Sequence, residues 1–105
     1  LLLTTLPLLA TARNDDWRLV WSDEFNTEGR LSPSVWNYEQ GYVRNEEAQW
    51  YQPDNAVCKG GFLVIEARKE RNRQNPLYIP GSNDWRKERE FIEYTSSSVT
   101  TLWAF

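Results

Sequence analysis

The chain has 105 residues, of which 40% are apolar and 14% aromatic, a composition typical of one small folded domain rather than a disordered segment. Its formal net charge is −3, so it lacks the basic excess with which proteins neutralise nucleic-acid phosphates. Histidine is absent, which excludes catalytic pairs of serine or cysteine with histidine and imidazole metal sites. Any catalysis must therefore rest on carboxylates.

Cys58 is the only cysteine, which excludes an internal disulfide and a thiolate zinc cluster. The side chain is either a reactive thiol or a small packed residue. Free cysteines are among the most buried residue types, so we expect Cys58 to be packed.

Residues 1–12, LLLTTLPLLATA, form an apolar run that ends in small residues and is followed at once by polar ones. The run resembles the hydrophobic region and cleavage site of a secretory signal, and we predict a signal-peptide remnant and a secreted, periplasmic or cell-surface protein. The alternatives are a buried N-terminal strand or an untidy translated start. The run falls short of the roughly 20 residues that cross a bilayer, so a membrane-spanning protein is not expected.

The first half of the chain carries three short strand patterns. Residues 17–25 alternate apolar and polar side chains, which predicts a half-buried strand that ends in a turn at Asp23 and Asn26. Residues 35–39 form a second, aromatic candidate, and residues 48–51 a third that is closed by turn-forming residues.

The clearest local signal is a β-hairpin. Two β-rich runs, residues 56–59 and 62–68, are joined by Gly60 and Gly61. Primed hairpin turns need positive φ, which glycine adopts without steric cost.

Residues 69–90 are polar and contain two prolines and mixed charges, which predicts a long surface loop. Long loops in compact domains tend to border functional sites, although each single charge in this one fits a solvated face equally well. Residues 91–101 return to β character, and no segment has a sustained helical period. Short strands spaced by turns indicate an all-β sandwich or barrel.

An aromatic and polar stretch is the first candidate site. Tyr42, Trp50 and Tyr51 lie close in sequence to the polar group of residues 44–49. A sugar groove needs such a mixture of flat rings and hydrogen-bonding side chains, whereas the alternative is ordinary strand packing.

A pair of carboxylates is the second candidate. Glycosidases use two, about 5 Å apart in retaining enzymes, and Glu66 and Glu70 would share one face of a continuous strand. Arg68 would share that face, and further basic residues surround the pair. Nearby cations lower carboxylate pKa values, so we assign this set a structural role.

Several ordered motifs then match one family. Residues 21–25, WSDEF, resemble the opening motif of glycoside hydrolase family 16, which includes laminarinases and lichenases. Trp36, residues 45–51 (NEEAQWY), Asn55, and residues 60–68 (GGFLVIEAR) resemble its next blocks in the same order. Residues 94–101 resemble the strand that follows, so the resemblance extends from Trp17 to Thr101.

The resemblance implies an antiparallel β-sandwich of the concanavalin-like jelly-roll type, here incomplete, with a glucan cleft on its concave face. It implies an endo-β-glucanase that hydrolyses β-1,3 or mixed β-1,3/1,4 linkages with retention, and β-glucan polysaccharide as the partner. Asn45 matches the asparagine that hydrogen-bonds a sugar in similar enzymes, and Tyr42 and Trp50 are candidates for the cleft wall.

The resemblance also implies a structural calcium ion, although no cofactor for the chemistry. Glu24, together with a backbone carbonyl of Gly60 or Gly61, matches part of the calcium site of many family members. Hard oxygen ligands of this kind are what calcium prefers.

One departure from the family bears on activity. Its two catalytic glutamates lie in a Glu-x-Asp-x-Glu strand downstream of the segment that matches residues 95–101, and the sequence contains no such strand. We therefore divide the chain into residues 1–12, residues 13–101 as the N-terminal part of a family 16 domain, and residues 102–105 as a divergent truncated end. We expect an inactive chain that is a monomer where it folds. The alternative is a non-catalytic, lectin-like sugar-binding module.

Overall fold

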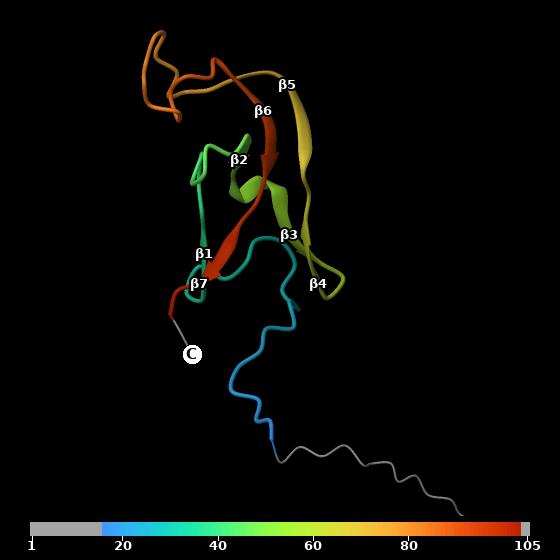
Figure 1. Ribbon diagram of the computed structural model, residues 1–105. Helices are drawn as coiled ribbons and strands as arrows, with labels where there is room; N and C mark the ends of the chain where they lie inside the picture. The colour runs from blue at the N-terminus through green and yellow to red at the C-terminus, as the bar shows by residue number, and fades with distance from the viewer. Residues whose placement is uncertain (1–15, 104–105) are drawn as a thin grey trace, which may run out of the picture.

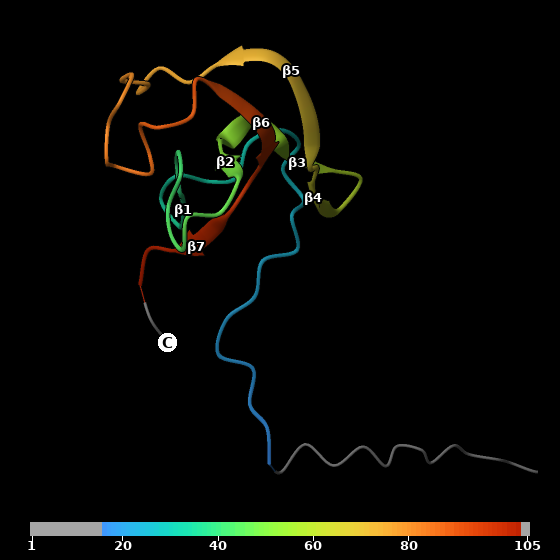
Figure 2. The ribbon, with the colours of Figure 1, turned by 45° about the horizontal axis from the view of Figure 1, so that its top comes forward.

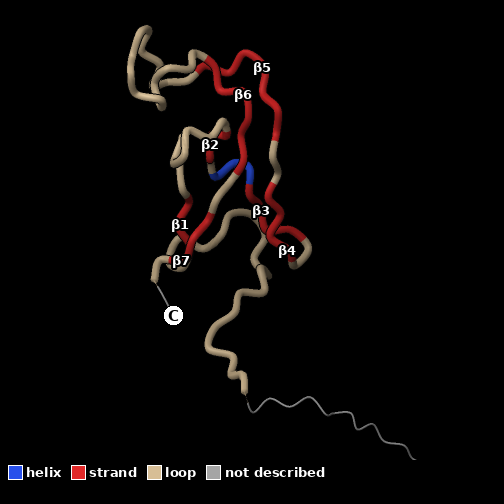
Figure 3. The backbone as a smooth tube through the Cα atoms, viewed as in Figure 1, coloured by secondary structure: helices blue, strands red, loops and turns tan. Residues whose placement is uncertain are grey.

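The computed structural model describes residues 16–103, which form short strands joined by turns and loops (Figure 1). A single 3-10 turn, η2 (Pro53–Asn55), lies between the second and third strands and is the one helical element of this described part (Figure 3). The predicted all-β class is confirmed. The strands are β1 (Trp36–Tyr38), β2 (Gln49–Tyr51), β3 (Ala56–Lys59), β4 (Phe62–Ile65), β5 (Arg68–Gln74), β6 (Phe91–Ser96) and β7 (Val99–Thr101).

The strands pair in three small sheets. β1 pairs antiparallel with β7, β3 pairs antiparallel with β4, and β6 lies between β2 and β5. β5 and β6 are antiparallel, with an irregularity between Lys69 and Arg73, whereas β2 and β6 are parallel. β6 and β7 follow one another along a single stretch of chain, which therefore contacts β5, β2 and β1 in turn (Figure 2).

The predicted hairpin is confirmed. Cys58 in β3 lies opposite Leu63 in β4. Gly60 and Gly61 join the two strands with φ values of 61° and 82°. Both values lie in the left-handed region, as a type I′ turn requires.

The strands predicted for residues 35–39, 48–51 and 91–101 are confirmed as β1, β2, and β6 with β7. The predicted loop at residues 69–90 is wrong in its first part, because β5 occupies residues 68–74. The sequence of β5, RKERNRQ, has no apolar period because nearly all its side chains are exposed. Its backbone pairing with β6, which sequence patterns do not reveal, makes it a strand.

The strand predicted for residues 17–25 is also wrong. This segment has no regular secondary structure, and Trp17, Leu19 and Val20 are 84%, 79% and 73% exposed. No described strand pairs with it, so its backbone groups have no ladder to join. The predicted turn at its end is present, since Asp23 Oδ1 accepts a hydrogen bond from the Phe25 backbone N–H at 2.8 Å.

In the described part of the chain, the interior contains few large apolar side chains. The buried apolar residues are Leu31, Tyr42, Ala56, Cys58 and Ile92. Polar side chains are buried beside them, namely Gln52, Asn55, Asn75, Thr95 and Ser97. Buried polar groups need hydrogen-bond partners, so hydrogen bonding has a large part in holding the strands together.

Cys58 offers a direct test of this packing. It is 2% exposed in β3, and burial raises the pKa of its thiol. We expect iodoacetamide to modify the native chain at pH 8 more than about tenfold more slowly than the chain in urea, because only an exposed thiolate reacts. The rate is measured by mass spectrometry, and equal rates in buffer and in urea would contradict the described core.

Candidate functional site

A tight turn carries Asn45 to the surface. The Glu47 backbone N–H donates to the Arg44 carbonyl at 3.2 Å and closes the turn. Asn45 and Glu46 have φ values of 60° and 54°. Asparagine tolerates this left-handed conformation better than most residues, whereas glutamate does not. The turn of residues 44–47 is therefore a strained segment that presents an exposed amide side chain.

One ion pair, a side-chain hydrogen bond and backbone pairing anchor the chain around this turn. Arg44 Nη2 donates to Glu39 Oε2 at 2.5 Å, and Ser98 Oγ donates to Glu39 Oε1 at 2.6 Å. These two hydrogen bonds, the one from Arg44 first, lower the pKa of Glu39. Gly41 and Tyr51 exchange two backbone hydrogen bonds of 2.9 and 3.0 Å. The turn is thus connected to β2 and to the link between β6 and β7.

An aromatic cluster lies beneath the turn. Tyr42 is 3% exposed, and its ring meets Trp50 edge to face with centroids 5.2 Å apart. The Trp85 ring also lies near Tyr42, with the ring centroids 6.0 Å apart. Burial raises the pKa of the Tyr42 phenol. Tyr42 is therefore an internal support, and Trp50 is half-buried next to it; sugar contact by either ring stays a prediction.

The loop of residues 75–90 lies against the same stretch of chain, and the sequence did not predict its key side chain. Arg86 donates from Nε to the Tyr42 carbonyl at 2.9 Å and from Nη2 to the Val43 carbonyl at 2.8 Å. Its guanidinium carbon lies 4.5 Å from the centroid of the Trp85 ring. No sequence pattern links residues separated by 44 positions, so this contact depends on the tertiary structure.

A shallow depression of about 330 Å³ opens between the turn and the start of β6. Ala48, which directly follows the turn, forms one side of it, and Phe91 is 40% exposed on the other. Its remaining lining residues are charged, namely Arg89, Glu90 and Glu93. A ring surrounded by hydrogen-bonding groups is suited to a sugar unit.

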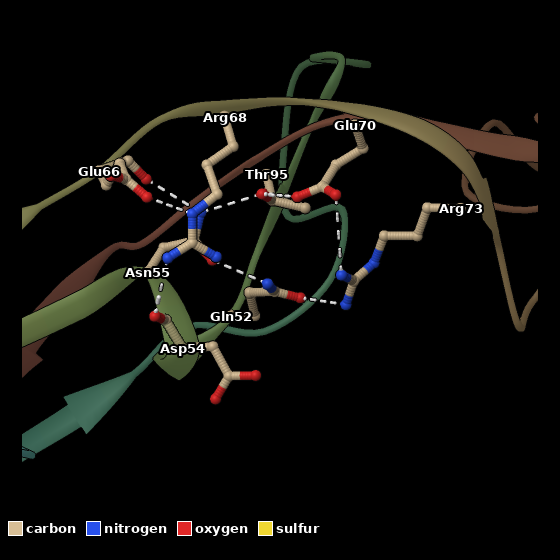
Figure 4. Close-up of polar contacts among 8 residues, drawn as sticks. All are labelled: Gln52, Asp54, Asn55, Glu66, Arg68, Glu70, Arg73 and Thr95. Carbon is tan, nitrogen blue, oxygen red and sulfur yellow. Dashed lines mark hydrogen bonds and ion pairs between the residues drawn. The ribbon is translucent and has the colours of Figure 1, made fainter.

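Glu70, one of the two carboxylates considered for catalysis, belongs to a partly buried ring of polar side chains (Figure 4). Gln52 Nε2 donates to Asn55 Oδ1 at 2.7 Å, and Asn55 Nδ2 donates to Thr95 Oγ1 at 2.9 Å. Thr95 Oγ1 in turn donates to Glu70 Oε2 at 2.6 Å. Arg73 completes the ring, since Nη1 lies 4.0 Å from Glu70 Oε1 and Nη2 donates to Gln52 Oε1 at 2.6 Å. We call these five residues the polar ring.

The positions of Glu66 and Glu70 agree with a structural role for both. Glu66 pairs with Arg68 in the segment that enters β5. Glu70 accepts a hydrogen bond from the Thr95 hydroxyl and lies near Arg73. Both carboxylates are thus occupied by contacts within the protein.

The predicted calcium ligands do not form a complete site. Glu24 is exposed, and the backbone N–H of Gly60 donates to Glu28 Oε1 at 3.1 Å. Within residues 16–103 no three acidic or thiol side chains gather in one place. Calcium takes six to eight oxygen ligands, more than Glu24 and the carbonyls of Gly60 and Gly61 supply. The ion stays a prediction.

Residues 16–103 include no helix of the length and apolarity that crossing a bilayer takes.

Comparison with known proteins finds similar glycoside hydrolases. No family model matches the chain. A β-glucanase of Rhodothermus marinus is 42% identical over 71 residues, which cover 60% of this chain and 25% of that protein. A solved non-specific endo-β-1,3(4)-glucanase of glycoside hydrolase family 16 is 30% identical with a TM-score of 0.53, covering 85% of this chain and 32% of the other. The chain is a relative of the family 16 glycoside hydrolases.

Another similar structure comes from work on the endo-acting O-glycanases with which human gut microbiota initiate mucin breakdown. It is 40% identical with a TM-score of 0.62, and the match covers 76% of this chain and 29% of that one. The likeness to family 16 structures confirms the predicted jelly-roll class. The chain spans about a quarter of the length of the curated relative and about a third of the solved structures.

The polar ring should stabilise the folded chain, and Asn55 tests this. Asn55 is 2% exposed, and its amide also donates to the Glu66 carbonyl at 2.9 Å. We expect Asn55→Ala to lower the free energy of unfolding by about 2 kcal/mol or more, because Gln52 and Thr95 each lose a buried partner. Urea denaturation measures the loss.

Asn83→Ala is the matched control, because Asn83 is exposed in the loop of residues 75–90. We expect it to change the free energy of unfolding by less than about 0.5 kcal/mol. Equal losses in the two variants would show that the polar ring does not stabilise the fold.

Proposed function

We propose that the chain binds β-glucan through the turn that carries Asn45 and the depression beside it. One observation carries this proposal: the Asn45 amide is exposed on a strained turn, and several contacts hold that turn in place. A preorganised amide offers a sugar both donor and acceptor without the entropic cost of ordering the loop on binding. The depression next to it adds a ring face and charged groups.

The relatives support glucan as the ligand class. The Rhodothermus marinus protein is named a β-glucanase, and a similar solved structure is an endo-β-1,3(4)-glucanase. The proposed parent activity is therefore retaining endo-hydrolysis of β-1,3 or mixed β-1,3/1,4-glucans. Asn45 would hydrogen-bond a sugar unit, with Trp50 at the cleft wall and Tyr42 as its support.

For the chain itself we propose binding without hydrolysis. The two carboxylates with suitable spacing, Glu66 and Glu70, are committed to Arg68 and to the polar ring. Glu39 has a lowered pKa, which also disfavours a general acid. A non-catalytic, lectin-like role then follows from the same surface.

A mucin O-glycan is the second candidate ligand. The O-glycanase-related structure, with a TM-score of 0.62, favours it. Both ligand classes are sugars, so the same groove chemistry serves either, and a titration with each oligosaccharide distinguishes them.

We also propose that the chain is exported and monomeric. The apolar residues 1–12 resemble a signal peptide and lie outside the described residues. Their removal would leave a secreted or cell-surface protein.

We expect laminari-oligosaccharides to shift the amide resonances of residues 42–50 in the purified chain without releasing reducing ends. Asn45→Ala should lower the affinity about 2- to 12-fold, the range that one lost hydrogen bond of 0.5–1.5 kcal/mol gives. Asn83→Ala should leave it unchanged. Shifts elsewhere, or an equal loss in both variants, would refute the assignment of the site, and released reducing ends would refute the lack of hydrolysis.

We propose weak calcium binding at Glu24 with Gly60 or Gly61. We expect the thermal midpoint to rise only at millimolar calcium, since few protein oxygens are available and sites of that affinity are known. Glu24→Gln should abolish the rise measured by scanning calorimetry. A midpoint that ignores both calcium and chelator would rule out this site.

A further inference from the structure

The loop of residues 75–90 has an internal framework centred on Asn75, which is 4% exposed. Asn75 Nδ2 donates to the carbonyls of Arg86 at 3.1 Å and Arg89 at 2.9 Å. Its Oδ1 accepts from the Leu77 backbone N–H at 2.9 Å, and its own backbone N–H donates to the Glu90 carbonyl at 2.9 Å. One residue thus holds the two ends of the loop together.

A second turn within the loop orients Arg86. Asp84 Oδ1 accepts from the Arg86 backbone N–H at 3.0 Å, and the Asp84 carbonyl accepts from Lys87 N–H at 2.8 Å. The guanidinium also stacks on the neighbouring Trp85 ring, which limits its rotation. The side chain therefore projects from an ordered base.

The Arg86 guanidinium reaches the chain just before the turn that carries Asn45. Two of its nitrogens bind the consecutive carbonyls of Tyr42 and Val43. A planar fork with several donors in fixed directions makes such a two-point contact, whereas a lysine ammonium is a single point charge. In Figure 1 the orange loop lies next to the green segment that contains this turn.

The contact matters because the turn is strained. Asn45 and Glu46 have consecutive positive φ values, and conformations of this kind persist only where surrounding contacts over-determine them. Arg44 and Gly41 supply two of those contacts, and Arg86 supplies the third, from outside the turn's own part of the sequence.

We propose that Arg86 is a positioning residue for glycan binding, which fixes the direction of the Asn45 amide by holding the carbonyls of Tyr42 and Val43. This inference rests on the proposed function, because it takes Asn45 as the sugar-binding group. The Arg86 Nε and Nη2 groups bind those two carbonyls, so Arg86 acts through the turn.

A double-mutant cycle tests the proposal in the full chain. Arg86→Ala should weaken laminari-oligosaccharide binding about as much as Asn45→Ala does, and Arg86→Lys should weaken it less. In the double variant Arg86→Ala with Asn45→Ala, the loss should equal that of Asn45→Ala alone, because a positioning residue has no effect once the group it positions is gone. Additive losses would overturn the proposal.

Arg71→Ala is the matched control, since it removes an exposed arginine from β5. We expect it to leave the affinity unchanged. Each variant is first unfolded in urea, and affinities are measured where every variant is more than about 95% folded, so that loss of folded protein does not count as loss of binding. An equal loss of affinity in Arg71→Ala would also overturn the proposal.

Hydrogen exchange provides a readout that needs no sugar. The Glu47 amide, bonded to the Arg44 carbonyl, should exchange about tenfold faster in Arg86→Ala and at the native rate in Arg71→Ala. An unchanged rate in Arg86→Ala would refute the proposal even if the wild-type chain binds no oligosaccharide. Absence of binding in the wild type would refute only the proposed function, so the two failures are distinguishable.

Discussion

The hydroxyl of Thr95 is the polar group on which most of this structure depends. Thr95 is fully buried in β6, where it accepts a hydrogen bond from Asn55 and donates one to Glu70. An unpaired hydroxyl in that position would cost roughly 1–3 kcal/mol. The polar ring satisfies it, and in doing so it connects η2, β5 and β6. The burial of one small side chain thus determines how three segments meet.

The polar ring compensates for a small apolar interior. Among residues 16–103 only a few large apolar side chains are buried, and Ile92 is the largest of those that are almost completely enclosed. In such a chain the register of β2 and β5 against β6 is set by directional hydrogen bonds as much as by packing, because each member of the ring must meet a particular partner. The irregularity between Lys69 and Arg73 lies beside Glu70, so the ladder bends where the ring takes up a side chain from β5.

The candidate site depends on the same strand pairing that the polar ring aligns. β2 is held against β6, and the segment before β2 carries Tyr42 and the turn of residues 44–47. The rings of Trp50 and Trp85 pack near Tyr42 in that segment, and the loop of residues 75–90, which leads from β5 into β6, binds it through Arg86. The strain at Asn45 and Glu46 is therefore held by elements that the polar ring itself aligns.

The sequence by itself determined the β class, the Gly60-Gly61 hairpin, the strands around Trp36, Trp50 and Phe91, and the relation to family 16. These features depend on local chemistry or on ordered motifs: glycine adopts positive φ, and aromatic or β-branched runs favour strands. Charge alone also indicated that Glu66 and Glu70 are structural, because Arg68 and its basic neighbours are visible in the sequence.

The tertiary structure alone decided which strands pair with one another. It left residues 17–25 without a pairing strand among the described elements and made a strand of the polar β5, since a strand requires a neighbour that supplies hydrogen bonds. It alone also brought Arg86 to Tyr42 and closed the polar ring, because contacts between residues distant in sequence are chosen by the packing of the whole chain and leave no local pattern.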